Sequence, residues 1–184
     1  FLVHHDNQKG NVTTLDGRET APASAGSDRF LGHDGKPISF ATAVSGGLSV
    51  GVPGNVALMA KAHARWGKLP WAQLFEPAIR LAEKGFRVNP ILARSIAAME
   101  PRWIDFPETR ALYAPQPDGI IRIPALAATL RRIAAAGPDE FYKGETAHAI
   151  STAVANAPRN PAQLTLNDLA TYDAKERPAL CGRY

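Results

Sequence analysis

The chain opens with two short apolar stretches that are separated by a polar tetrapeptide. Phe1–Asp6 and Asn11–Leu15 contain several β-branched residues, and Asn7–Gly10 lies between them. β-branched residues favour strands, and a tight turn needs a residue that accepts a positive φ, which Gly10 supplies. The pattern predicts an early β-hairpin. Ala23–Ser39 is rich in Gly, Ser, Asp and Pro and predicts a long loop.

The spacing of apolar residues changes to a helical period after Pro53–Gly54. Two helices are predicted in succession, the first ending at Gly67 in a left-handed conformation and the second ending at Gly85. Pro77 lies inside the second helix and predicts a kink or break after its first turn. The apolar faces comprise Val56, Met59, Ala60 and His63 in the first helix, and Trp71, Leu74, Phe75, Ala78, Ile79 and Ala82 in the second.

Later helices are predicted from their capping signals. Asn89 is an N-cap before Pro90, Pro124 opens a helix that Gly137–Pro138 ends, and Thr165 and Asp168 form a capping box. A further helix is predicted over Glu145–Ala157. The predicted buried positions are Ile91, Leu92, Ile96 and Met99 after Asn89, Leu126, Leu130 and Ile133 after Pro124, and Ala147, Ile150 and Val154 in the helix from Glu145.

Strands remain few along the chain. Besides the hairpin, Leu48–Val52 and Lys175–Tyr184 are predicted to be extended. The fold class is therefore α+β, mostly helical with an early β-hairpin. So few strands do not form an independently stable sheet, and we expect them to complete a sheet made largely by another segment or chain.

Composition and charge narrow the function classes. The 184 residues are 45% hydrophobic and 21% charged, which fits one globular core, and the net charge of +4 comes from scattered Lys and Arg residues. This distribution predicts no nucleic-acid partner. No apolar stretch approaches the roughly 18 residues that a membrane span needs. The five histidines lack the spacing of a helical zinc site, and Cys181 is the one cysteine, so neither a metal nor a cofactor is expected.

Two glycine-containing motifs near residue 50 point to other chemistries. Gly47–Gly51 matches the Gly-x-Ser-x-Gly pattern of a serine nucleophile, Ser49, and the order of such a triad leaves His63 or His148 as the base. That motif requires a strand before the serine and a helix directly after it, and neither is predicted here. The same glycines do not have the spacing of a phosphate-binding loop, because no Gly-Lys-Ser or Gly-Lys-Thr follows.

The residues that follow the hairpin carry a better candidate. Arg18 and Glu19 stand where the chain leaves a predicted strand, in the stretch Leu15–Pro22. A guanidinium at this place can bind a carboxylate through two parallel hydrogen bonds, and Glu19 can orient either the arginine or the substrate. By spacing alone, a solvated surface ion pair is the more common outcome for such a dipeptide.

An ordered series of motifs resembles the large subunit of the γ-glutamyltranspeptidases, also called γ-glutamyltransferases. The series covers almost the whole chain and consists of Leu15–Pro22, Gly51–Gly54, Trp66–Trp71, Pro77–Ala82 with Gly85–Phe86, Pro124–Leu130, Phe141–Gly144 and Leu164–Leu169. The succession is specific, although no single motif is decisive.

The resemblance implies a fold and a reaction. The family is made as a precursor that cleaves itself into two subunits within the four-layer αββα sandwich of the N-terminal-nucleophile hydrolases. A Thr at the start of the small subunit is the nucleophile and attacks the γ-amide of glutathione or a similar γ-glutamyl compound, and water or an amino acid or peptide then accepts the acyl group. Arg18 matches the arginine that binds the α-carboxylate of the γ-glutamyl group.

The resemblance also defines what we expect to be absent. Residues 1–184 are predicted to form a single partial domain, with the upstream segment and the small subunit outside it. No catalytic residue is therefore assigned in this chain, which should be inactive alone. The substrate-binding candidates are Arg18 and Glu19, and the expected partners are the small subunit and a γ-glutamyl substrate.

Alternatives of other classes stay open at this point. One is a non-catalytic helical binding or scaffold module of the same fold, and another is a related cephalosporin or glutaryl acylase. The family's usual export in bacteria predicts a periplasmic or secreted protein.

Overall fold

The sheet joins the two ends of the chain. In the computed structural model, which describes residues 1–114 and 119–182, β1 (Leu2–Asp6), β2 (Asn11–Asp16) and β5 (Lys175–Arg177) form an antiparallel sheet in the order β1-β2-β5. Leu15 pairs with Glu176 in the β2–β5 ladder. The predicted hairpin is confirmed, and Gly10 has the expected positive φ of 64°.

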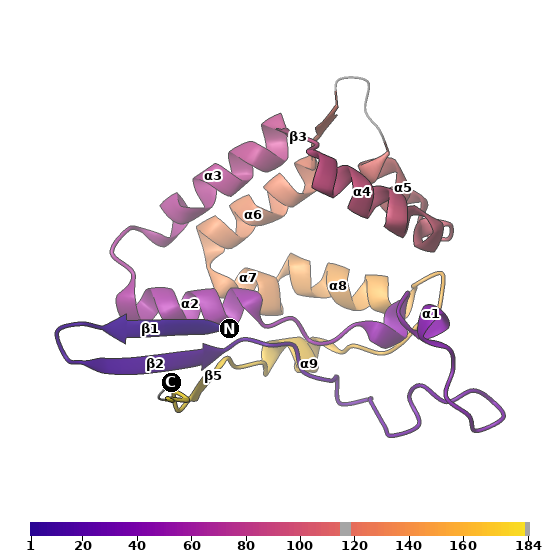
Figure 1. Cartoon of the computed structure of the whole chain (residues 1–184), viewed down its shortest axis with the longest axis horizontal. Helices are drawn as coiled ribbons and strands as arrows, with labels where there is room; N and C mark the ends of the chain where they lie inside the picture. Colours follow the sequence, from indigo (N-terminus) through magenta and orange to yellow (C-terminus); the bar gives the residue numbers. More distant parts are fainter. Residues whose placement is uncertain (115–118, 183–184) are drawn as a thin grey trace.

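Helices make up most of the remaining described structure, in agreement with the α+β prediction (Figure 1). They are α1 (Phe40–Ala43), α2 (Asn55–Trp66), α3 (Trp71–Lys84), α4 (Pro90–Met99), α5 (Pro107–Tyr113), α6 (Pro124–Ala136), α7 (Pro138–Lys143), α8 (Glu145–Ala155) and α9 (Leu166–Ala170). Two 3₁₀ turns, η1 (Gly47–Ser49) and η2 (Glu100–Trp103), and a small ribbon of β3 (Phe86–Arg87) with β4 (Ile120–Ile121) complete the order.

Local capping explains where several helices begin and end. The Asn89 side chain accepts a hydrogen bond from the backbone N–H of Leu92 at 2.9 Å, and α4 starts directly after it. Thr165 and Asp168 form the predicted capping box at α9. Gly137 ends α6 with a φ of 78°, and Pro138 opens α7, a helix that the sequence pattern did not predict.

The main hydrophobic core lies between the helices that follow the sheet. Its fully buried members come from α2, α3 and α6–α9 and from the loops beside them, and they are Val52, Val56, Phe75, Ile133, Tyr142, Ala147, Val154, Leu164 and Leu169. A second cluster of Leu15, Leu58 and Ala174 attaches the sheet to α2. Apolar residues, among them Phe1 and Val3, are exposed on the outer face of the hairpin. Exposed apolar residues of this kind are typical of a sheet that is covered or extended by another segment.

Several local predictions are wrong. The break predicted at Pro77 is wrong, since α3 runs from Trp71 to Lys84 with its apolar face packed along α6. Gly67 caps α2 with a φ of −63°, so it is not left-handed. Leu48–Val52 forms the η1 turn and a single bridge through Val52 instead of a strand.

The predicted apolar faces are also less buried than expected in places. Leu74, Ile91, Met99 and Leu126 are exposed, and Ala78 is exposed as well. In α4 no residue is fully buried. Helical periodicity therefore located the longer helices but missed short ones such as α5 and α7, and it did not determine how much of each apolar face another element covers.

Candidate functional site

The backbone around Arg18 is fixed from two sides. The backbone N–H of Arg18 donates to Asp16 Oδ1 at 2.9 Å, a local turn that ends β2. The carbonyl of Arg18 accepts a hydrogen bond of 2.6 Å from the hydroxyl of Tyr172, which follows α9. The site residue therefore stands on a rigid strand end that a distant segment also holds.

The Arg18 side chain itself extends into open space. Its Nη2 atom lies 2.7 Å from Glu19 Oε1, and the two side chains are 65% and 50% exposed. An ion pair this exposed contributes little to stability, because water screens it. Its guanidinium donors therefore remain accessible to an incoming anion.

A small pocket surrounds the Arg18–Glu19 pair. It has a volume of about 180 Å³. Its lining is mostly charged and consists of Asp16, Arg18, Glu19, Thr20, Tyr172, Asp173, Lys175 and Arg177. A second hollow of about 330 Å³ continues from it past Val52 and Asp168, sharing Thr20, Tyr172, Asp173 and Lys175. Because both signs of charge are present, the pocket suits a zwitterionic or partly neutralised small molecule.

Strong hydrogen bonds keep one carboxylate of the pocket ionised. The Arg18 backbone N–H, and after it the Arg177 guanidinium at 2.6 Å, hold the pKa of Asp16 below its ordinary value. Burial raises the pKa of Tyr172, and the nearby carboxylates, Asp16 foremost, add to the increase. Asp16 is therefore a charged acceptor and Tyr172 a protonated donor at neutral pH.

The Gly51–Gly54 motif lies against the Leu15–Pro22 motif, which contains Arg18. Thr20 and Val52 exchange two backbone hydrogen bonds, of 3.3 and 2.8 Å. A Cβ at Gly51 would lie 3.0 Å from Glu19 Cγ, and one at Gly54 would overlap both the Tyr172 hydroxyl and the Gly17 carbonyl. These two glycines therefore serve close packing behind Arg18.

The structure does not make Ser49 a nucleophile. Its hydroxyl donates to the carbonyls of Val44 and Gly46 at 3.1 and 3.0 Å, within a 3₁₀ turn that replaces the required strand and helix. His63 bonds instead to the carbonyl of Leu69 at 2.8 Å, and His148 is exposed on α8. The serine-hydrolase alternative is therefore not supported by the geometry.

Residues 1–114 and 119–182 contain no group of three or more His, Cys, Asp or Glu side chains able to hold a metal ion. None of their helices has the length and apolar character that crossing a membrane demands.

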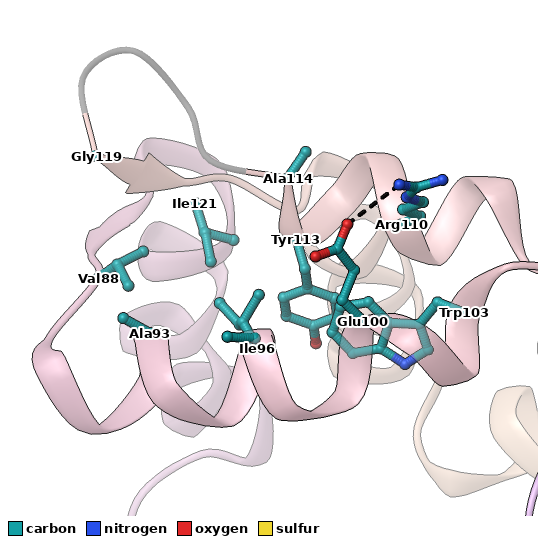
Figure 2. Close-up of a pocket in the computed structure, with 11 residues that line it drawn as sticks. Val88, Ala93, Ile96, Glu100, Trp103, Arg110, Tyr113, Ala114, Gly119 and Ile121 are labelled. Atoms are coloured by element: carbon teal, nitrogen blue, oxygen red, sulfur yellow. Dashed lines mark hydrogen bonds and ion pairs between the residues drawn. The ribbon is translucent and has the colours of Figure 1, made fainter.

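A larger and mainly apolar cavity lies elsewhere, between α4, α5 and the β3–β4 ribbon (Figure 2). Its volume is about 450 Å³, and its walls are mainly apolar, including Val88, Ile96, Trp103 and Ile121. An ion pair at 3.2 Å, between Glu100 and Arg110, borders it. It shares no residue with the Arg18 pocket, and α4 and α5 lie across the molecule from the sheet (Figure 1).

Sequence reasoning missed most partners of Arg18. Tyr172, Asp173, Lys175 and Arg177 follow α9, more than 150 positions after Arg18, and the antiparallel pairing of β5 with β2 brings them to the pocket. The predicted extended segment at Lys175 was the available signal, but its partner strand could not be read from the sequence.

Fold and site together define a mostly helical α+β segment that presents a rigidly mounted arginine for an anionic group. The profile of the family described as "Gamma-glutamyltranspeptidase" matches residues 1–184. The chain belongs to the γ-glutamyltranspeptidase family, and its fold is that of the corresponding part of these N-terminal-nucleophile hydrolases.

Individual relatives agree with this assignment. The chain is 33% identical over 190 residues to the glutathione hydrolase proenzyme of Bacillus subtilis, covering 100% of this chain and 32% of that protein. It matches the γ-glutamyltranspeptidase from Pseudomonas nitroreducens complexed with L-DON at 33% identity and a TM-score of 0.86, over 96% of this chain and 51% of that one.

A cephalosporin acylase is also among the similar structures. The enzyme from Bacillus halodurans is 28% identical with a TM-score of 0.75, over 91% of this chain and 32% of that one. The chain thus spans about a third of the length of the curated relatives it matches.

Proposed function

We propose that this chain is the large-subunit part of a γ-glutamyltransferase or hydrolase, in which Arg18 binds the α-carboxylate of a γ-glutamyl amide such as glutathione. The observation that best supports this proposal is the geometry at Arg18, which we call the Arg18 corner. Its backbone is held at both the N–H and the carbonyl, its guanidinium is exposed, and its motif resembles the one that holds the family's substrate-binding arginine. Rigid mounting of a binding group reduces the entropy lost when substrate binds.

The Arg18–Glu19 pair complements the head of a γ-glutamyl group. That head carries an α-carboxylate and an α-ammonium on one carbon, and the two side chains present opposite charges 2.7 Å apart. Arg18 takes the carboxylate through its planar donors, while Glu19 orients the guanidinium or accepts from the ammonium. The γ-amide then points away from the pair, toward the nucleophile.

The reaction itself needs a second subunit in this proposal. The nucleophile is the N-terminal Thr of the small subunit, exposed by self-cleavage of the precursor, and its own amine acts as base. The relatives' name "proenzyme" supports this maturation. Water or an amino acid or peptide resolves the acyl-enzyme. We place the mature protein in the periplasm or outside the cell, which cell fractionation with a periplasmic marker tests.

Maturation is tested on the protein expressed from its full reading frame. Intact mass and N-terminal sequencing should find two fragments, the smaller beginning with Thr. L-DON, bound by the Pseudomonas nitroreducens relative, should inactivate the cleaved protein. A single uncleaved chain that does not react with L-DON would instead favour the non-catalytic scaffold module.

The role of Arg18 is tested in the same full-length protein. Arg18→Ala should lower kcat/KM for a γ-glutamyl donor by about 30-fold to about 4,000-fold, because losing one partner of a charged pair costs about 2–5 kcal/mol. Self-cleavage should continue. Trp103→Ala, in the wall of the apolar cavity, is the matched control and should leave kcat/KM within about twofold. Normal turnover by Arg18→Ala would refute the assignment.

The cephalosporin acylase remains the second candidate because that structural relative also covers most of the chain. The discriminating observation is the substrate profile of the cleaved protein. Turnover of γ-glutamyl amides with no release from glutaryl or cephalosporin side-chain amides supports the first proposal, and the opposite profile supports the acylase.

A further inference from the structure

Tyr172 links the backbone of Arg18 to the helical core, because it bonds to the Arg18 carbonyl. Its hydroxyl donates to that carbonyl at 2.6 Å across 154 positions of sequence. Tyr172 is half-buried, and its ring stacks on that of Tyr142 with the planes 5° apart and the centroids 5.9 Å apart. The hydroxyl is therefore delivered by a ring whose own position is fixed.

Tyr142 anchors this pair of rings. It is 6% exposed, and its hydroxyl donates to the Pro53 carbonyl at 2.8 Å while accepting from the Ala57 backbone N–H at 3.1 Å. Both of its hydrogen-bonding partners belong to the turn that starts α2. The stack thus connects the start of α2, through two rings, to the backbone of the substrate-binding candidate.

Gly54 lets the Tyr172 hydroxyl reach its acceptor. A Cβ at this position would overlap the hydroxyl of Tyr172 and the carbonyl of Gly17. The small residue in the Gly51–Gly54 motif therefore leaves the space through which Tyr172 approaches the turn at Arg18.

The two peptide planes that flank the Arg18 Cα are held by different bonds, one local in sequence and one long-range. The Arg18 N–H is bonded locally, to Asp16 at 2.9 Å, and that bond forms in any chain that makes the turn. Within residues 1–114 and 119–182, its carbonyl accepts a hydrogen bond from Tyr172 alone. Loss of the hydroxyl would release the peptide plane on the C-terminal side of Arg18. Because the two planes that flank the Arg18 Cα together fix the direction of its Cα–Cβ bond, that direction would then be less constrained.

We propose that Tyr172 is a positioning residue for substrate binding, whose hydroxyl sets the direction in which the Arg18 side chain leaves the backbone. The proposal rests on the proposed function, because it concerns how Arg18 meets the substrate carboxylate. Tyr172 touches no reacting atom in this scheme. Its effect is confined to the geometry of the two hydrogen bonds between guanidinium and carboxylate, which tolerate little misplacement.

Tyr172→Phe in the full-length, self-cleaved protein tests the idea. The change keeps the ring and its stack on Tyr142 and removes one hydroxyl. KM for a γ-glutamyl donor should rise about threefold to tenfold, the range for losing one hydrogen bond, with kcat within about twofold. Tyr113→Phe is the matched control, since Tyr113 is also half-buried and stacks on another ring, Trp103, and it should leave KM unchanged.

A donor analogue without the α-carboxylate gives the decisive readout. Tyr172→Phe should bring no further penalty on this analogue, because the positioned contact is already absent. An equal penalty on both donors would overturn the positioning role, as would an unchanged KM on the natural donor.

Tyr142→Phe separates positioning from general loosening. It removes the hydroxyl that holds the start of α2 but leaves the bond between Tyr172 and Arg18. We expect a lower Tm with no carboxylate-specific rise in KM, and a rise equal to that of Tyr172→Phe would refute the proposal.

Arg18→Ala, assayed with both donors, separates the two proposals. If Arg18→Ala does not discriminate between donors with and without the carboxylate, the proposed function fails. If it does and Tyr172→Phe does not, only the positioning role of Tyr172 fails.

Discussion

The surroundings of Arg18 are more tightly packed than the α4–α5 unit, although the cavity of the α4–α5 unit is the larger of the two. The cavity of α4–α5 is about 450 Å³ and mainly apolar, whereas the pocket at Arg18 is about 180 Å³ and mainly charged. Behind Arg18 stand Tyr142 at 6% exposure and Leu169 at 0%. In α4, η2 and α5 no residue is fully buried.

This difference teaches that cavity volume does not identify a site of polar recognition. A large apolar hollow reflects helices that pack incompletely on one another. The smaller pocket has oriented polar groups, among them the Asp16 carboxylate, which Arg177 and the Arg18 N–H hold, and the Tyr172 hydroxyl, which is bonded to the Arg18 carbonyl. Recognition of a charged group needs such preorganised polar atoms more than it needs space.

The largest expected contrast is in stability. Leu169→Ala in α9 should lower the free energy of unfolding by about 2–5 kcal/mol, because a fully buried side chain leaves a cavity. Ile96→Ala in α4 should cost less than half as much, since Ile96 is half-buried and lines an existing hollow. Urea-induced unfolding of the full-length protein measures both. Equal losses would show that α4–α5 is as firmly packed as the core beneath Arg18.

A smaller effect is expected from crowding the space behind Arg18. Gly54→Ala should destabilise the protein by about 1–3 kcal/mol, because the added methyl group overlaps the Tyr172 hydroxyl and the Gly17 carbonyl. The variant should also raise KM for the γ-glutamyl donor. Gly182→Ala is the control, since a Cβ there meets nothing within 4 Å. A Gly54→Ala protein with unchanged Tm would mean that Tyr172 moves aside freely.

The smallest expected effect depends on pH. The pKa of Asp16 is lowered, so its carboxylate stabilises the fold above the ordinary value of 3.8, and this contribution is lost as pH falls through the lower folded pKa. The Tm difference between wild type and Asp16→Asn should therefore be positive at pH 7 and shrink to nothing in acid below pH 3.8.

The α4–α5 unit provides the control for that titration. Glu100→Gln removes the carboxylate of an ion pair whose side chains are 53% and 58% exposed, so Tm at pH 7 should change little. A Tm difference for Asp16→Asn that stays constant down to strongly acid pH would contradict the assigned role of the carboxylate.

Much of the secondary structure could be predicted because its causes are local. The turn at Gly10, the cap at Asn89 and the capping box at Thr165 each depend on residues within four positions of one another. Errors arose where distant packing overrode a local rule. Pro77 remains within α3 because the helix is supported along α6, and a local rule for proline has no access to that support.

The candidate site was predicted only in part. Arg18 and Glu19 do form a pair at the mouth of a pocket, as a substrate-binding role requires, and that role stays a prediction. On spacing alone, a surface ion pair was the better interpretation of the dipeptide. The ordered motifs of the family favoured substrate binding, since their similarity integrates many weak local signals along the whole chain.

By itself, the sequence determined the fold class and the family, and it predicted Arg18 as the substrate-binding candidate. Periodicity, caps and short motifs all depend on residues that are close together in the chain. Only the tertiary structure decided that Tyr172 bonds to the Arg18 carbonyl, that β5 pairs with β2, and that Gly54 leaves room between them. Contacts of this kind join residues more than 100 positions apart. They depend on how the helices between them pack, which no short stretch of sequence specifies.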